Sequence, residues 1–155
     1  MSTSPWEAFA LIGCCVVATA PAQAANDIEG AFDALAAVIQ DYSGEAVQER
    51  YCSPVVCNGY IGNDQFNITW ANGGWLQVSL LPSSGPMQTN LLHCAIVIEY
   101  ATGLGTDGSG LLAGRLAAEA ANNGSAETET AGAELKARQT NSGMLECDAN
   151  RPTPL

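Results

Sequence analysis

Basic residues are scarce in this 155-residue chain, which has five Lys and Arg against 16 Asp and Glu. Its formal net charge is −11 at pH 7. A surface of this sign repels the phosphates of nucleic acids and the head groups of anionic lipids, so neither is an expected partner. The same charge attracts cations, and the composition therefore favours a basic protein or peptide as the partner.

Long apolar runs are also missing, because the longest covers only residues 8–20. A helix of this length cannot cross a hydrocarbon core of about 30 Å, so we expect no membrane span. Pro21 and the small-x-small site Ala22-Gln23-Ala24 follow the run. This pattern predicts a signal peptide over residues 1–24 and a periplasmic or secreted chain that starts at Ala25.

Two features of the leader bear on this interpretation. The segment before the apolar run contains Trp6 and Glu7 but no Lys or Arg, where an export signal normally carries positive charge. The sequence Leu-Ile-Gly-Cys at residues 11–14 resembles a bacterial lipoprotein site, which is the alternative. Since the apolar run continues past Cys14 to Val17, cleavage near Ala24 is preferred.

The spacing of the cysteines and the presence of a single histidine do not fit a zinc site of the usual kind. The chain has no Cys-x-x-Cys pair and a single histidine, His93. Four of the six cysteines follow the predicted cleavage site, and an even number in an exported domain predicts two disulfides. The most local pairing, which we expect, joins Cys52 to Cys57 across a Ser-Pro turn and Cys94 to Cys147.

The hydrophobic pattern predicts one extracytoplasmic domain over residues 25–150, with residues 151–155 as a free tail. Apolar residues at helical spacing predict a helix over residues 26–42. The apolar run 91–101 is compatible with a buried helix or a buried strand, and its length favours the helix. A short helix is expected around 112–122, and turn-forming residues predict an irregular, disulfide-closed loop at 45–64.

Alternating residues predict a β-hairpin over residues 66–81. With Asn72-Gly73-Gly74 as its loop, the inward pairs are Trp70 with Leu76, Ile68 with Val78, and Phe66 with Leu80. A second hairpin near 134–148 places Arg138 opposite Glu146, Lys136 opposite Asp148, and Ala137 opposite Cys147, and a short strand at about 126–131 adds to it. The predicted fold is α+β: a small antiparallel sheet built from two hairpins, covered on one side by about three helices, with two disulfides.

The first hairpin has a polar face centred on Trp75. Its other members are Asn67, Thr69, Gln77 and Ser79. An aromatic ring among amide and hydroxyl groups suits contact with a sugar or a protein, so we consider this a possible binding face. The alternative is that the helix at 91–101 covers this face and Trp75 belongs to the core.

Two further motifs have simpler interpretations than a functional one. Gly103-Leu-Gly-Thr-Asp-Gly108 matches the dinucleotide pattern G-x-G-x-x-G, but the chain is too short for a doubly wound domain and Asp107 would repel a pyrophosphate. A turn between helices is expected instead, and no cofactor. The sequons at Asn67 and Asn123 are common by chance, and the alanine-rich, bacterial-looking sequence predicts that neither is glycosylated.

No catalytic residue can be named from the sequence. No serine lies in G-x-S-x-G, the cysteines are better used as disulfides, and His93 is expected as a partly exposed helix residue. The sequence therefore favours a non-enzymatic extracytoplasmic binding or accessory protein, such as an inhibitor with a basic target. The alternatives are a small carboxylate-dependent hydrolase and a structural envelope protein.

The leader gives the first testable prediction. Intact-mass measurement of the exported protein should show a chain that begins at Ala25, or at Gln23 if the signal peptidase uses the neighbouring Ala-Pro-Ala site. A lipidated Cys14 or an intact N-terminus would show that the export argument is wrong.

Overall fold

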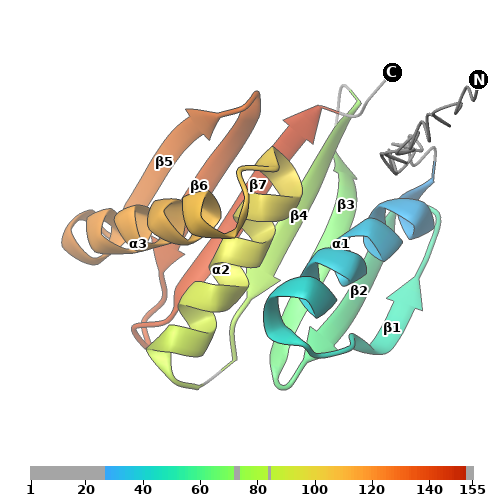
Figure 1. Cartoon of the computed structure of the whole chain (residues 1–155), viewed down its shortest axis with the longest axis horizontal. Helices are drawn as coiled ribbons and strands as arrows, with labels where there is room; N and C mark the ends of the chain where they lie inside the picture. Colours follow the sequence, from blue (N-terminus) through green and yellow to red (C-terminus); the bar gives the residue numbers. More distant parts are fainter. Residues whose placement is uncertain (1–26, 72–73, 84, 153–155) are drawn as a thin grey trace, which may run out of the picture.

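A computed structural model of the chain describes residues 27–71, 74–83 and 85–152. The predicted signal peptide lies outside these residues. The described part forms three helices and seven strands, and the strands make one antiparallel sheet in the order β1-β2-β3-β4-β7-β6-β5. The helices lie on one face of this sheet (Figure 1). The elements are α1 (Ile28–Ser43), β1 (Gln48–Cys52), β2 (Val56–Ile61), β3 (Asp64–Ala71), β4 (Trp75–Leu81), α2 (Met87–Thr102), α3 (Thr106–Asn123), β5 (Ser125–Thr130), β6 (Ala133–Gln139) and β7 (Leu145–Pro152).

The α+β class is as predicted, but the sheet is larger than two hairpins. A meander of four strands and a meander of three join where β4 pairs with β7. The prediction counted too few strands because it interpreted residues 45–64 as an irregular loop. That interpretation is wrong, since these residues contain the hairpin of β1 and β2.

Gly59 explains why the strand pattern of β2 is hard to recognise. The inward positions of this strand are Cys57, Gly59 and Ile61, so a glycine interrupts the apolar alternation. A Cβ at residue 59 would lie 2.3 Å from a methyl carbon of Val47 and 3.1 Å from the Phe32 ring of α1. Glycine at this position therefore allows α1 to approach the sheet closely.

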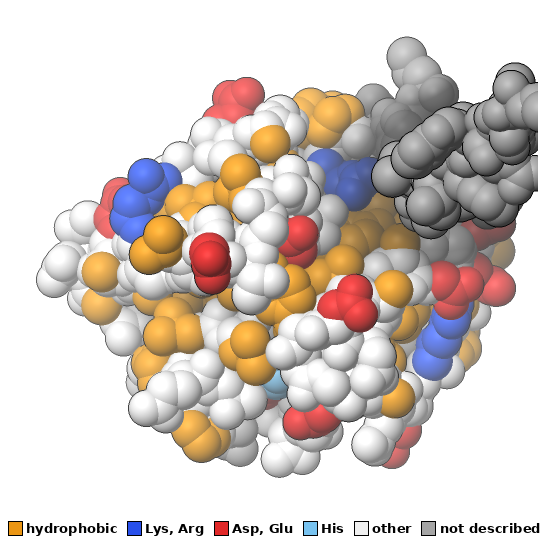
Figure 2. Space-filling view, in the orientation of Figure 1, with side chains coloured by type: hydrophobic (Ala, Val, Ile, Leu, Met, Phe, Trp, Pro, Cys, Tyr) orange, Lys and Arg blue, Asp and Glu red, His pale blue; other side chains and the backbone are white. Residues whose placement is uncertain are grey.

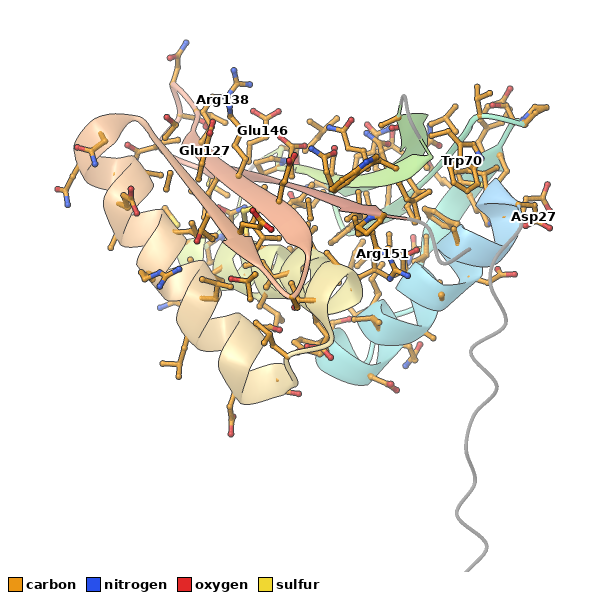
Figure 3. All side chains as sticks on the ribbon, turned by 90° about the horizontal axis from the view of Figure 1, so that it is seen from above. Asp27, Trp70, Glu127, Arg138, Glu146 and Arg151 are labelled. Atoms are coloured by element: carbon orange, nitrogen blue, oxygen red, sulfur yellow. A yellow bond between two sulfur atoms is a disulfide. The ribbon has the colours of Figure 1, made fainter. Side chains whose placement is uncertain are left out.

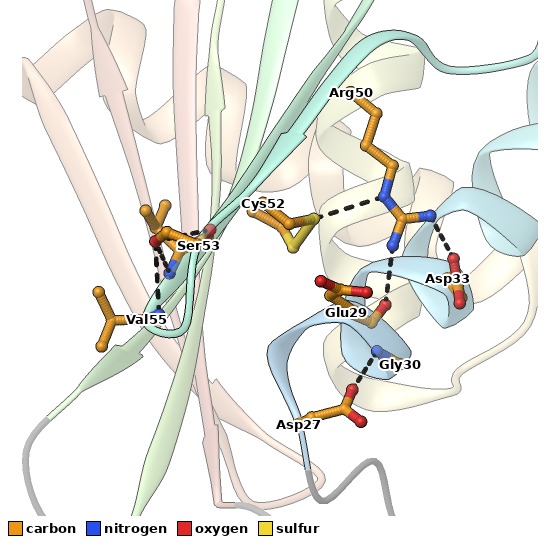
Figure 4. Close-up of a disulfide and its surroundings, with 10 residues drawn as sticks. Asp27, Glu29, Gly30, Asp33, Arg50, Cys52, Ser53 and Val55 are labelled. Carbon is orange, nitrogen blue, oxygen red and sulfur yellow. Dashed lines mark hydrogen bonds and ion pairs between the residues drawn. A yellow bond between two sulfur atoms is a disulfide. The ribbon is translucent and has the colours of Figure 1, made fainter.

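Local contacts fix α1 as predicted. Asp27 accepts a hydrogen bond of 2.6 Å from the backbone N–H of Gly30 at the start of the helix, and Gly44, with φ 72°, ends it. Arg50 of β1 reaches across to α1, where it ion-pairs with Asp33 and donates to the Glu29 carbonyl at 3.3 Å (Figure 4). The edge strand β1 is thus held to α1 as well as to β2.

Both predicted hairpin registers are confirmed. Ile68 pairs with Val78 in the first hairpin, and Ala137 pairs with Cys147 in the second. Trp70 lies on the helix side as expected, but it is only half-buried at the margin of the core. Strand β5 was also predicted, with a shift of one residue.

Strand β7 continues further than the sequence suggested. Arg151 pairs with Leu76 and Pro152 with Trp75, so the free tail predicted for 151–155 does not begin at 151. Residues 153–155 lie outside the described part. Arg151 donates from Nη1 to the Tyr100 carbonyl at 2.9 Å and its guanidinium lies over the Tyr100 ring, so the end of β7 is held against α2.

Helix α2 is confirmed as a helix, and its surroundings explain the ambiguous pattern. It packs against α1 and α3 and against the central strands β4 and β7, and nine of its 16 residues are buried. Because such a helix has apolar residues on most sides, the hydrophobic periodicity of its sequence is weak. The Tyr100 hydroxyl donates to the Ala31 carbonyl at 3.1 Å, and burial raises the pKa of this tyrosine.

The glycine motif is mainly a turn between helices. Gly103 ends α2 with φ 65°, Gly105 precedes α3, and Gly108 lies within the first turns of α3. Among the described residues, no helix combines the length and apolar character needed to cross a bilayer.

The two disulfides are Cys52–Cys57 and Cys94–Cys147, the pairing predicted from the sequence. The first closes the short β1–β2 hairpin and the second joins α2 to β7. On the chain-entropy estimate, loops of these sizes contribute about 2 and about 4 kcal/mol respectively to the free energy of unfolding. Chemical denaturation should therefore show a larger loss for Cys94→Ala/Cys147→Ala than for Cys52→Ala/Cys57→Ala. Equal losses would show that strain or residual unfolded-state structure outweighs loop length.

Candidate functional site

The polar face predicted around Trp75 lies on the side of the sheet away from the helices. Asn67 is opposite Ser79, Thr69 opposite Gln77, and Ala71 opposite Trp75, and all of these residues are half-buried. The alternating residues Val78 and Leu80 point to the helix side and are fully buried. Since α2 packs on that other side, the alternative in which it covers Trp75 is wrong.

Strand pairing continues this face into the second meander. Along one row, Gln77 of β4 is opposite Asn150 of β7, which is opposite Glu134 of β6, and Glu134 is opposite Glu129 of β5. A second row runs beside it and contains Ser79, Asp148, Lys136 and Glu127. We call the outward side chains of these two rows and their continuation into β3, together with Trp75, the open face.

A shallow hollow of about 520 Å³ occupies the β4, β7, β6 and β5 part of the open face. Its lining includes four carboxylates and one ammonium group: Glu127, Glu129, Glu134, Asp148 and Lys136. Gln77 also lines it, so one residue of the sequence-predicted set belongs to the hollow. The hollow thus joins an amide-rich region to an acidic one.

The acidic region has more negative charge than its own cations neutralise. Lys136 is ion-paired with Glu127, while Glu129, Glu134 and Asp148 form no ion pair within the described residues. Glu129 and Glu134 lie directly opposite each other, and like charges in that arrangement are unfavourable by up to about 1 kcal/mol.

The other cation on the outward side of β6, Arg138, is already engaged. Arg138 donates to the Glu146 carboxylate from Nε at 3.1 Å, and the hydrogen bonding and charge of Glu146 raise the pKa of Arg138. Figure 3 shows Glu127, Arg138 and Glu146 on the side of the sheet away from the helices. Glu129 and Glu134 were not predicted as site residues. The register of the second hairpin contained the signal for Glu134, since this residue alternates with inward Leu135.

A second polar arrangement lies on the helix side and was missed. His93 Nδ1 is 2.7 Å from Asp64 Oδ2, and the two residues are 3% and 5% exposed. The prediction of a partly exposed His93 is therefore wrong: the ring faces β3, where its edge meets Phe66. The other oxygen of Asp64 accepts the Ser83 backbone N–H at 3.0 Å.

In a catalytic triad, the histidine Nδ1 also contacts a carboxylate, so this pair resembles two of the three members of a triad. No described hydroxyl or thiol hydrogen-bonds to Nε2, and Cys94 is disulfide-bonded, so the nucleophile of a triad is missing from the part of the chain described. Nor do the described residues contain three or more His, Cys, Asp or Glu side chains grouped to hold a metal. Separation by 29 residues left no local motif from which the pair could be predicted.

Comparison of the chain with protein-family models, with curated proteins and with solved structures found no match. The geometry of the chain's own residues is therefore the basis for assigning a function. That geometry contains two features of interest: the open face with its acidic hollow, and the buried Asp64–His93 pair.

Proposed function

We propose that this is a non-enzymatic extracytoplasmic binding or accessory protein whose open face binds a basic protein partner. The observation that carries the proposal is the Glu129–Glu134 pair, two opposed carboxylates without an ion-pair partner among the described residues. A lysine or arginine from a partner would relieve this repulsion. The favourable free energy from that relief would arise only in the complex. The formal charge of −11 adds long-range attraction to the same class of partner.

The amide-rich half of the open face supports recognition of a partner by hydrogen bonds and aromatic contact as well as by charge. Asn67, Thr69, Gln77 and Ser79 offer hydrogen-bond donors and acceptors at the regular spacing of strands. Trp75 adds a large aromatic surface beside them, of the kind enriched in binding hot spots. Disulfides and the absence of a membrane-spanning helix among the described residues are compatible with a location outside the cytoplasm.

Charge removal at the hollow tests the proposal. An octalysine peptide serves as the basic probe, and its affinity is measured by calorimetry at 20 and 200 mM NaCl. Glu129→Gln/Glu134→Gln should weaken binding at least about fivefold, because the opposed carboxylates are the local attraction. Asp41→Asn/Glu119→Gln is the matched control, since it removes the same charge from exposed sites on α1 and α3. Equal weakening by both double variants would mean that only net charge matters and that the hollow is not a site.

The tryptophans separate a binding role from a stability role. Trp70 packs at the margin of the core, so we expect Trp70→Ala to lower the free energy of unfolding by about 1–3 kcal/mol. Trp75→Ala should change it by less than about 1 kcal/mol, because the residue lies on the open face. When the mature chain is used to pull down proteins from envelope extract at low salt, the Trp75→Ala variant should fail to retain partners that the wild type retains. Unfolding by urea measures both stabilities, and a large loss for Trp75→Ala would show that this ring is structural.

A further inference from the structure

A cavity of about 410 Å³ lies on the helix side, apart from the open face. It is formed where the β2–β3 turn, the segment before α2, the first turns of α2 and Met144 meet. Its polar lining includes Glu45, Asn63, Asp64, Thr89, Asn90 and His93. This volume is at the small end of the range for ligand pockets, about 300–1,000 Å³, and fits a compact molecule.

Most buried polar groups of this cavity are already used in the fold. Asn90 donates to the Leu145 carbonyl at 2.8 Å and accepts the Leu145 N–H at 2.6 Å. Each oxygen of Asp64 accepts one hydrogen bond, from Ser83 or from His93. These groups hold the walls in place and leave few acceptors for an occupant.

His93 Nε2 is the exception. In the neutral ring that donates from Nδ1 to the Asp64 carboxylate, the other ring nitrogen, Nε2, has a lone pair. Nε2 has no hydrogen-bond partner among the described residues, and His93 lines the cavity. Figure 2 shows a small area of histidine surface in a recess on the helix side. A nearly buried side chain that lines the cavity thus has one ring nitrogen without a partner in the described structure.

The charges around this acceptor favour a cation. Glu45 and Asp64 line the cavity, and no Lys or Arg of the described residues does. The Glu45 side chain is exposed and has no ion pair in the described structure, so its carboxylate is free to take a positive charge. A protonated amine satisfies both groups, since one N–H can donate to Nε2 while the charge lies near Glu45.

We propose that this cavity binds a small primary amine in its ammonium form, held by His93 Nε2 and the Glu45 carboxylate. Asp64 is a positioning residue: its contact with Nδ1 orients the ring, and in the neutral ring that donates from Nδ1 it leaves Nε2 as the acceptor. The site is distinct from the open face, and its occupant is a small molecule rather than a protein. The opposing possibility is that the cavity binds an anion at the start of α2. The N-terminus of this helix has no side-chain cap, and N–H groups there can bind an anion.

The single histidine makes the test direct, because its ring signals in NMR need no assignment among several histidines. Propylammonium chloride is titrated into the protein at pH 8, with sodium propionate, 1-propanol and sodium chloride as matched probes. Propylammonium should shift the His93 Nε2 and Hε1 signals with a Kd of the order of 1–10 mM. Propanol should bind at least about fivefold more weakly, and propionate and sodium chloride should leave the signals unchanged.

Glu45→Gln keeps His93 and its contact with Asp64, and should weaken propylammonium binding at least about fivefold. Glu119→Gln, on the exposed side of α3, is the control and should change it less than twofold. A response to propionate, no response to propylammonium at 100 mM, or equal losses in both variants would overturn the proposal. Octalysine binding to the open face is measured separately on the same variants, so that failure of either site is distinguishable from failure of the other.

Discussion

The attachment of α2 to both halves of the sheet is the constraint on which the rest of the structure depends. Toward the first meander, His93 is held by Asp64 at the start of β3. Toward the second, Asn90 exchanges two hydrogen bonds with Leu145, and Cys94 is bonded to Cys147. Because these anchors lie within two turns of one helix, they fix β3 and β7 relative to each other across the intervening strand β4.

The same arrangement separates the two faces of the sheet chemically. Helices cover the face of the sheet that carries the apolar side chains (Figure 1), and the outward positions of β3 to β7 carry amides, hydroxyls and carboxylates. Strand pairing then places these groups in straight rows, which is how Glu129 comes to lie opposite Glu134. A repulsion of this kind is tolerated on an exposed surface, and a cationic partner would remove it.

The two candidate sites differ in how they are built. The open face follows from regular strand geometry, so its residues occur at alternate positions along four or more strands. The cavity beside His93 follows from the meeting of irregular segments with α2, and the ring of its buried histidine is positioned by a buried acid. Extended polar rows suit a protein surface, whereas a cavity of about 410 Å³ suits a small molecule.

The amino-acid sequence was sufficient to predict α1, the register of both hairpins and the disulfide pairing. The helix and the registers depend on periodicity and turn residues, and closing the local Cys52–Cys57 pair leaves Cys94 and Cys147 for each other. The β1–β2 hairpin was missed because its inward Gly59 is required by the close approach of Val47 and Phe32, a tertiary reason that leaves no apolar signal. The contact of His93 with Asp64 and the placing of Gln77 and Glu134 in one hollow follow from the tertiary structure, because they bring together residues 29 and 57 positions apart that no local pattern links.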